Sequence, residues 1–185
     1  MITRPPLIVL LAAFGVLGTL AIPAGAAGRP RTVKVTGTES DSEGLKPDGA
    51  ECSVSAGGCH AVAVGHVEFA GGIAGKASYI LRIAPDLRPD GLHYSGSAHF
   101  DRVVTPCGTG AVDIDFRGVY QPTTFDPATH TTTNVEEYDV RVGSGTGGLA
   151  GVTGTWTSIL RDHNDGTTDG RYSGFLTCPG PPTRH

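Results

Sequence analysis

Charged side chains alternate along two segments of the chain, residues 109–120 and 134–143, in a pattern that suits acid–base chemistry. Every second side chain of an extended strand points to one face, and each segment collects charged groups on such a face: Asp113, Asp115 and Arg117 on the first, and Glu137, Asp139 and Arg141 on the second. A hairpin symmetric about Pro127 would place Asp115 opposite Asp139. Inside a barrel, one of two facing carboxyls holds its proton to a higher pH, so Asp115 and Asp139 are the candidate catalytic acid and base.

The same register allows a purely structural interpretation of this hairpin. It places Asp113 opposite Arg141 and Arg117 opposite Glu137, which are complementary cross-strand pairs. On an exposed surface, water screens the repulsion between the two facing aspartates. The opposite face carries enough apolar side chains to be the core side: Val112, Ile114, Phe116, Tyr138, Val140 and Val142. The pattern favours this solvated ladder, and the interior acid pair is the alternative that would bring catalysis.

A glycine-rich segment, residues 143–148, matches the G-x-G-x-x-G pattern of dinucleotide-binding proteins. Such a site needs a helix after the glycines, with its N-terminus facing the pyrophosphate. The following residues are rich in glycine and β-branched side chains, which disfavour a helix. We therefore predict a structural turn that contains Gly145, Gly147 and Gly148, and no nucleotide cofactor.

Two further patterns resemble metal sites. The aspartates of residues 162–170 lack both the glycine spacing and the closing glutamate of a calcium loop, so a hairpin tip is favoured. His66 with Glu68, and His99 with Asp101, each place an imidazole and a carboxylate on one strand face. In a simple meander, however, the intervening strand separates the two pairs. We expect no metal and no other cofactor.

Six aromatic side chains are large enough to fill a barrel or to line a cavity within it: Tyr79, Tyr94, Phe100, Phe116, Tyr138 and Trp156. Core packing is the default role of such groups, and contact with a ligand is the alternative. The chain has no G-x-S-x-G elbow for a nucleophilic serine.

Four cysteines permit three disulfide pairings. Cys52 and Cys59 flank a short loop, whereas Cys107 and Cys178 both lie beside turn residues at strand ends. We expect the pairs Cys52–Cys59 and Cys107–Cys178. The second pair closes a loop of about 70 residues and contributes roughly 4 kcal/mol on the chain-entropy model. A zinc site is disfavoured because the chain has no C-x2-C pair.

Alternating and β-branched residues predict an all-β protein with eight strands, joined mainly by short hairpins. The expected strands are residues 32–38, 60–70, 75–84, 91–104, 109–120, 134–143, 149–161 and 167–178, and the longest connection is 121–133. Eight antiparallel strands of about ten residues close into a barrel that is filled or holds one small ligand. A two-sheet β-sandwich is the alternative. Glycines within the strands favour the barrel because they mark bends and close packing.

The segment VGSGTGGLAGVTGTW, residues 142–156, resembles a glycine turn that enters a barrel strand in dirigent proteins and in allene oxide cyclase barrel-like proteins. Cys107-Gly108-Thr109-Gly110 and Cys178-Pro179 are similar to motifs of bacterial secreted proteins of unknown function that have such a barrel. The resemblance spans roughly residues 60–179. It implies an antiparallel barrel of the calycin type that works without metals or nucleotides and acts on, or orients, small apolar molecules.

Composition and charge narrow the classes of partner. The chain has 185 residues, with 14 Lys plus Arg against 18 Asp plus Glu, and a formal net charge of −4. This length suits one domain. The absence of a basic excess makes nucleic acid an unexpected partner.

The first 26 residues have the features of a secretory signal peptide. A lone Arg4 precedes an apolar run over residues 7–20, and small residues end the segment at Ala26. The run is shorter than the roughly 20 residues of a transmembrane helix. We expect cleavage near Ala26, a secreted product without a membrane anchor, and oxidised cysteines.

These observations divide the chain and leave three functions open. The expected parts are a signal peptide (1–26), an N-terminal strand and polar loop with the first cysteine pair (27–59), a barrel domain (60–179) and a disordered tail (180–185). The first expected function is the binding of a small apolar molecule in the barrel. A cofactor-free cyclase, isomerase or dirigent-like enzyme would need polar groups that point inward, and a cell-envelope interaction module would have a packed interior. A homo-oligomer is compatible with each.

Overall fold

The computed structural model describes residues 29–41, 46–53, 58–88, 91–120, 126–163 and 165–180. Within these ranges the chain forms nine strands and one short 3-10 helix: β1 (Arg31–Asp41), β2 (Lys46–Ser53), β3 (Gly58–Gly71), β4 (Ala74–Arg88), β5 (Gly91–Thr105), β6 (Gly108–Tyr120), β7 (Thr131–Val140), η2 (Gly147–Leu149), β8 (Thr153–His163) and β9 (Thr168–Cys178). No helix in these ranges has the length and apolar character that crossing a membrane requires.

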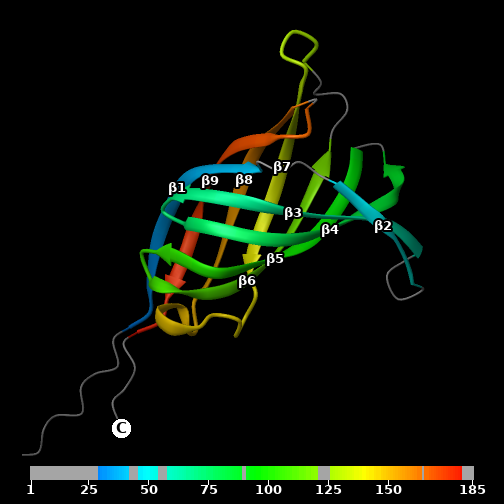
Figure 1. Cartoon of the computed structure of the whole chain (residues 1–185). Coiled ribbons are helices and arrows are strands. Elements are labelled where there is room, and N and C mark those ends of the chain that lie inside the picture. The colour runs from blue at the N-terminus through cyan, green and yellow to red at the C-terminus, as the bar shows by residue number, and fades with distance from the viewer. Residues whose placement is uncertain are drawn as a thin grey trace, which may run out of the picture.

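The strands form one antiparallel sheet that closes on itself. Their order is β1-β9-β8-β7-β6-β5-β4-β3-β2, and β1 also pairs with β3, from Gly37 opposite Gly71 to Ser40 opposite Glu68. This last pairing closes the sheet into an eight-stranded barrel, which consists of β1 together with β3 through β9. β2 lies outside the barrel and extends beside the start of β3 (Figure 1). The predicted eight-stranded barrel is confirmed, and the β-sandwich alternative is wrong.

The N-terminal region contains the strand predicted at residues 32–38, extended to β1, and a second strand within the stretch predicted as a polar loop. β1 is a full member of the barrel, because it pairs along its whole length with β9. Residues 46–53 form β2, whose register with β3 shifts between Pro47 and Gly49. The sequence did not predict this strand, because proline and glycine are uncommon inside strands. An edge strand with a bulge nevertheless tolerates both. The expected signal peptide and residues 181–185 of the expected tail lie outside the described residues.

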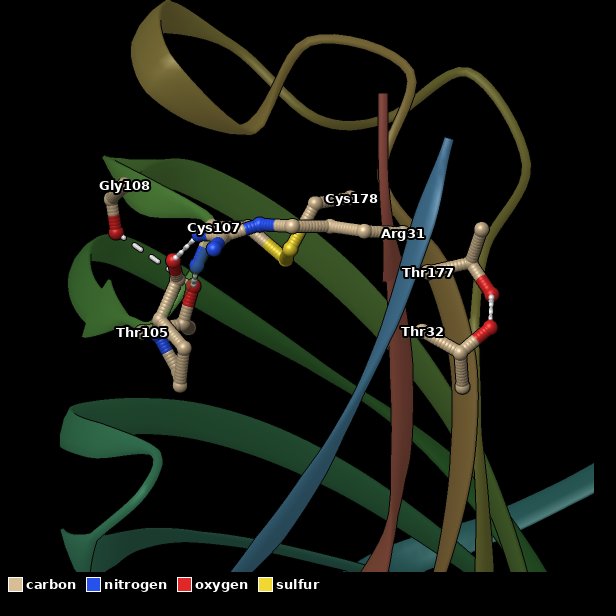
Figure 2. The surroundings of a disulfide bond; sticks show 8 residues. Arg31, Thr32, Thr105, Cys107, Gly108, Thr177 and Cys178 are labelled. Carbon is tan, nitrogen blue, oxygen red and sulfur yellow. Dashed lines mark hydrogen bonds between the residues drawn. A yellow bond between two sulfur atoms is a disulfide. The ribbon is translucent and has the colours of Figure 1, made fainter. Parts of the chain in front are cut away.

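One end of the barrel is cross-linked and covered. The predicted Cys107–Cys178 disulfide is present and joins the β5–β6 turn to the end of β9, with 5.0 Å between the two Cα atoms. Figure 2 shows the Arg31 guanidinium beside it, donating from Nη2 to the carbonyl oxygen of Pro106 at 2.8 Å. The backbone positions of Cys52 and Cys59 face each other in the β2–β3 ladder. Their sulfur atoms lie outside the described side chains, so that predicted pair stays a prediction.

The predicted glycine turn lies at the same end of the barrel (Figure 1). Gly147 has a φ of 57°, a conformation that glycine adopts without strain, and it begins η2. Leu149 of η2 is only 1% exposed and packs into the core. The segment therefore covers the end of the barrel and has a structural role. This agrees with the predicted structural turn, which was inferred because no long helix was expected after the glycines.

Aromatic rings fill the interior next to this covered end. The ring of Phe69 lies 5.5–6.1 Å, centroid to centroid, from four others: Phe100, Tyr138, Trp156 and Tyr172. Such tilted and edge-on contacts add to the stabilisation that burial of the rings provides. Phe100 and Trp156 therefore serve the packed half of the barrel, which we call the closed half.

Candidate functional site

The β6–β7 hairpin has the predicted register but exposes its charged face to solvent. Asp115 is opposite Asp139, and Arg117 is opposite Glu137. The side chains of Asp115 and Asp139 are 52% and 48% exposed, and each lies within salt-bridge distance of an arginine, Arg141 and Arg117 respectively. The interior acid pair is therefore wrong, and the solvated ladder is confirmed. Burial of the apolar face of the hairpin decides this orientation.

Four other acidic side chains point into the barrel: Glu39 and Asp41 from β1, Glu136 from β7 and Asp162 from β8. Glu39, Asp41 and Glu136 are 4%, 8% and 9% exposed. Because side chains alternate along a strand, Glu136 shares the inner face with Tyr138, and Asp162 shares it with Leu160. Following the alternation outward from these core residues would have identified the acids from the sequence. Buried acids are rare, however, and sequence reasoning assigns such residues to the surface.

The four acids line a cavity of about 140 Å³ in the half of the barrel opposite the disulfide. Apolar side chains form much of its wall: Val67, Leu81, Ile83, Leu92, Phe116 and Leu160. Four of the six aromatic residues predicted to line a ligand site do line this cavity: Tyr79, Tyr94, Phe116 and Tyr138. The other two, Phe100 and Trp156, lie in the closed half, around a void of only about 20 Å³.

Tyr138 connects two of the acids at the floor of the cavity. Its hydroxyl group lies within hydrogen-bond distance of both Glu39 Oε1 and Glu136 Oε2. A tyrosine hydroxyl has one proton to donate, and an ionised carboxylate only accepts. Two separate hydrogen bonds at this oxygen therefore need a second proton, which a protonated Glu39 or Glu136 would supply. We call these three residues the Glu–Tyr–Glu cluster.

The surroundings of the cluster favour retention of that proton. Burial is the main cause that raises the pKa of Glu39 to about 8, and the charge of Glu136 adds to it. Burial likewise raises the pKa of Glu136 to about 7. Ser158 donates to Glu39 Oε2, and Tyr94 donates to Glu136 Oε1 at 2.7 Å. Near neutral pH the cluster is thus poised to gain or lose a proton.

The neighbouring tyrosines act as donors. Tyr79 donates to Asp41 Oδ2 at 2.5 Å. Burial raises the pKa values of Tyr79, Tyr94 and Tyr138 above the usual range, and nearby carboxylates add to the effect. These hydroxyl groups consequently keep their protons and orient the carboxyl groups that they contact.

The cavity also has a polar group that lacks a partner. Asn134 donates from Nδ2 to Asp162 Oδ2, and Thr168 donates to Asp162 Oδ1 at 3.0 Å. Burial raises the pKa of Asp162 as well. Asn134 is 5% exposed, and among the described residues nothing donates to its Oδ1. A ligand that donates a hydrogen bond there would remove the cost of this unsatisfied acceptor.

The described part of the chain holds no cluster of three or more His, Cys, Asp or Glu side chains arranged to bind a metal ion. The described cavity wall contains no lysine, arginine or histidine. The site is thus apolar over most of its surface and acidic at one place. Its groups are suited to receive a hydrogen-bond donor or a positive charge, and to exchange a proton.

Comparison with known proteins supports the fold. No family model matches the chain, and no curated protein matches it. Among solved structures, the chain is similar to a protein with unknown function from the DUF3224 family of Shewanella oneidensis MR-1. The TM-score is 0.53 with 21% sequence identity, and the match covers 82% of this chain and 100% of the other. At this level of identity the likeness shows the barrel architecture alone.

Proposed function

We propose that this protein is a secreted barrel that binds one small, largely apolar molecule in its cavity. The observation that carries the proposal is the cavity of about 140 Å³, bounded mainly by apolar and aromatic side chains at one end of a closed barrel. An apolar cavity of about 150 Å³ in another protein accommodates benzene, so a single aromatic ring is the expected scale of the ligand. An interaction module with a packed interior would have no use for this space.

Two features support a location outside the cell. The Cys107–Cys178 disulfide is typical of proteins that fold in an oxidising compartment. Residues 1–26 carry the charge, apolar run and small residues of an export signal. The resemblance of residues 142–156 to dirigent and allene oxide cyclase barrel-like proteins agrees with a small apolar ligand.

A second candidate function is cofactor-free acid–base catalysis on the bound molecule, as in a cyclase or isomerase. It is favoured by the Glu–Tyr–Glu cluster, in which burial raises the pKa values of Glu39 and Glu136 to about 8 and about 7. A general acid or base works best when its pKa lies near the pH of the reaction. Glu39 and Glu136 thereby take the roles that sequence analysis assigned to Asp115 and Asp139.

Native mass spectrometry of protein isolated from the culture medium of the producing cells tests the binding function. We expect a mass adduct of one small molecule, which tandem fragmentation would identify. Adding toluene to the purified protein should shift NMR signals of cavity residues such as Ala98 and Leu160. Bare protein in the mass spectra, together with unchanged NMR signals, would count against binding.

A substitution that fills the cavity provides a matched variant. Ala98 is 4% exposed and lines the cavity, so Ala98→Phe would place a ring where the ligand ring belongs. We expect at least tenfold weaker toluene binding, with a cost in stability of about 1–3 kcal/mol from overpacking. Ala70→Phe makes the same change at an exposed strand position and should leave binding unaltered. Equal affinities of the two variants would place the ligand elsewhere.

A further inference from the structure

We infer that the cavity selects a small organic cation, in which an ammonium group lies against the buried acids and an apolar or aromatic body fills the remaining space. This inference rests on the proposed binding function and names the chemical class of the ligand. It separates this site from a general apolar pocket, which would prefer an uncharged molecule of the same shape.

The charges around the cavity are the first support. Glu39, Asp41, Glu136 and Asp162 line it, and no basic side chain does so among the described residues. The other titratable groups near these acids are five tyrosines and one histidine: Tyr79, Tyr94, Tyr120, Tyr138, Tyr172 and His163. The His163 Nε2 atom contacts the carboxylate of Asp169, 2.5 Å away, and His163 is not part of the cavity wall. An anionic ligand would therefore meet only repulsion, whereas a cation would neutralise buried negative charge.

The remaining wall supplies what the other parts of such a ligand need. The unsatisfied Oδ1 of Asn134 accepts an N–H that an ammonium group can donate. The rings of Phe116 and Tyr138 lie 5.7 Å apart along the wall, and Tyr79 is edge-on to Phe116 at 6.2 Å. Aromatic faces attract cations and also bury an apolar ligand body. The free acceptor of Asn134 and the aromatic wall together fit an amine that carries a small ring or a short alkyl chain.

Proton exchange links this selectivity to pH. Without a ligand, the Glu–Tyr–Glu cluster holds a proton because burial raises the pKa values of Glu39 and Glu136 to about 8 and about 7. An ammonium group would take the place of that proton as the positive charge. Below these pKa values, each proton that the cation displaces makes the affinity for the cation rise by up to tenfold for every unit of increase in pH. Binding of the cation should therefore strengthen from pH 6 to pH 8, while an uncharged ligand shows little change.

Three probes of similar size test the inference on the full exported protein: benzylamine, toluene and benzoate. An alkyl ammonium stays protonated throughout pH 6–8, as the lysine side chain does. By NMR titration we expect benzylamine to bind at least tenfold tighter than toluene at pH 8, and at least tenfold tighter at pH 8 than at pH 6. Benzoate should not bind. Toluene binding equal to or tighter than benzylamine binding would overturn this inference and leave the proposed function standing. No binding by any probe would contradict both.

Two adjacent glutamates on β7 provide the variant and its control. Glu136→Gln removes an inner charge but retains the shape of the side chain, and Glu137→Gln removes the charge of a side chain that is 55% exposed on the outer face. We expect the first variant to lose at least tenfold in benzylamine affinity and the second to lose almost none. Toluene binding by both variants shows that the cavity is intact. An unchanged benzylamine affinity in Glu136→Gln, with toluene still bound, would contradict the inference.

Discussion

Tyr138 holds two buried glutamates through one hydroxyl oxygen, which makes the proton content of this cluster a property of the fold. In the unfolded chain both glutamates would titrate near the ordinary pKa of about 4.3. In the folded protein burial holds the pKa of Glu39 at about 8 and that of Glu136 at about 7. Between these limits the folded state binds more protons than the unfolded state.

The stability of the protein should consequently fall as the pH rises. The contribution of the cluster is fully present below about pH 4 and is lost as the pH passes through the folded pKa values of Glu39 and Glu136. We expect the free energy of unfolding to decrease by an amount on the order of a few kcal/mol from pH 5 to pH 8. Urea unfolding at several pH values measures this.

Glu39→Gln serves as the control for this dependence, because glutamine does not titrate. The slope of stability against pH should be clearly smaller in this variant than in the wild type. The raised pKa of exposed His99, caused mainly by its hydrogen bond to Asp113, is common to both proteins and cancels in the comparison. Identical slopes in the two proteins would mean that Glu39 does not cause the pH dependence of stability.

At the scale of elements, alternation predicted the eight strands of the barrel, but the acids on their inner faces were not identified from it. The β6–β7 register followed from the complementary charges of Asp113 with Arg141 and of Arg117 with Glu137, because a period of two leaves few other alignments. On β1, the inner face carries Val33, Val35 and Gly37 before the two acids, and the predicted strand ended at residue 38, before both acids. Glu136 stands next to Glu137, which is exposed, so both residues are expected in solvent unless the strand face that Glu136 shares with Tyr138 is considered.

Glycines on the inner faces of the strands make room for aromatic rings of their neighbours. Gly118 of β6 is opposite Tyr94 of β5, and a Cβ atom at Gly118 would lie 2.3 Å from the Tyr94 ring. The strand glycines predicted to mark close packing include this one. Because Tyr94 also donates to Glu136, the glycine indirectly positions an acid of the cavity.

Gly118→Ala should therefore destabilise the protein by about 1–3 kcal/mol through overpacking. The three nearest atoms to the added Cβ all belong to the Tyr94 side chain. In a Tyr94→Ala background the same substitution should cost much less, since the clashing ring is gone. Chemical denaturation of the four proteins of this cycle gives the coupling energy. A coupling near zero would show that the ring does not set the requirement for glycine.

At the scale of the whole molecule, the barrel has two unlike halves. The closed half holds the packed rings, η2 and the Cys107–Cys178 disulfide, and the opposite half holds the acid-lined cavity. The disulfide joins cysteines 71 positions apart in the sequence and ties the end of β9 to the β5–β6 turn. It therefore stabilises the half of the barrel opposite the cavity.

Replacing both Cys107 and Cys178 by serine should lower the free energy of unfolding by about 2–4 kcal/mol. Urea midpoints of the variant and the wild type measure the change. Toluene binding under native conditions should persist in the variant, because the cavity lies in the other half of the barrel. An unchanged midpoint would contradict a stabilising role, and lost binding in a folded variant would contradict the separation of the two halves.

Arg31 at the beginning of β1 lies directly opposite Cys178 at the end of β9, so the chain enters and leaves the barrel side by side at the covered base. A tag, a fusion partner or a solid support attached through the segments outside this pair would sit beneath the barrel. Immobilised in that way, the molecule would present the end that holds the acid-lined cavity to the surrounding solution, which is the orientation that a surface-based test of the proposed binding needs.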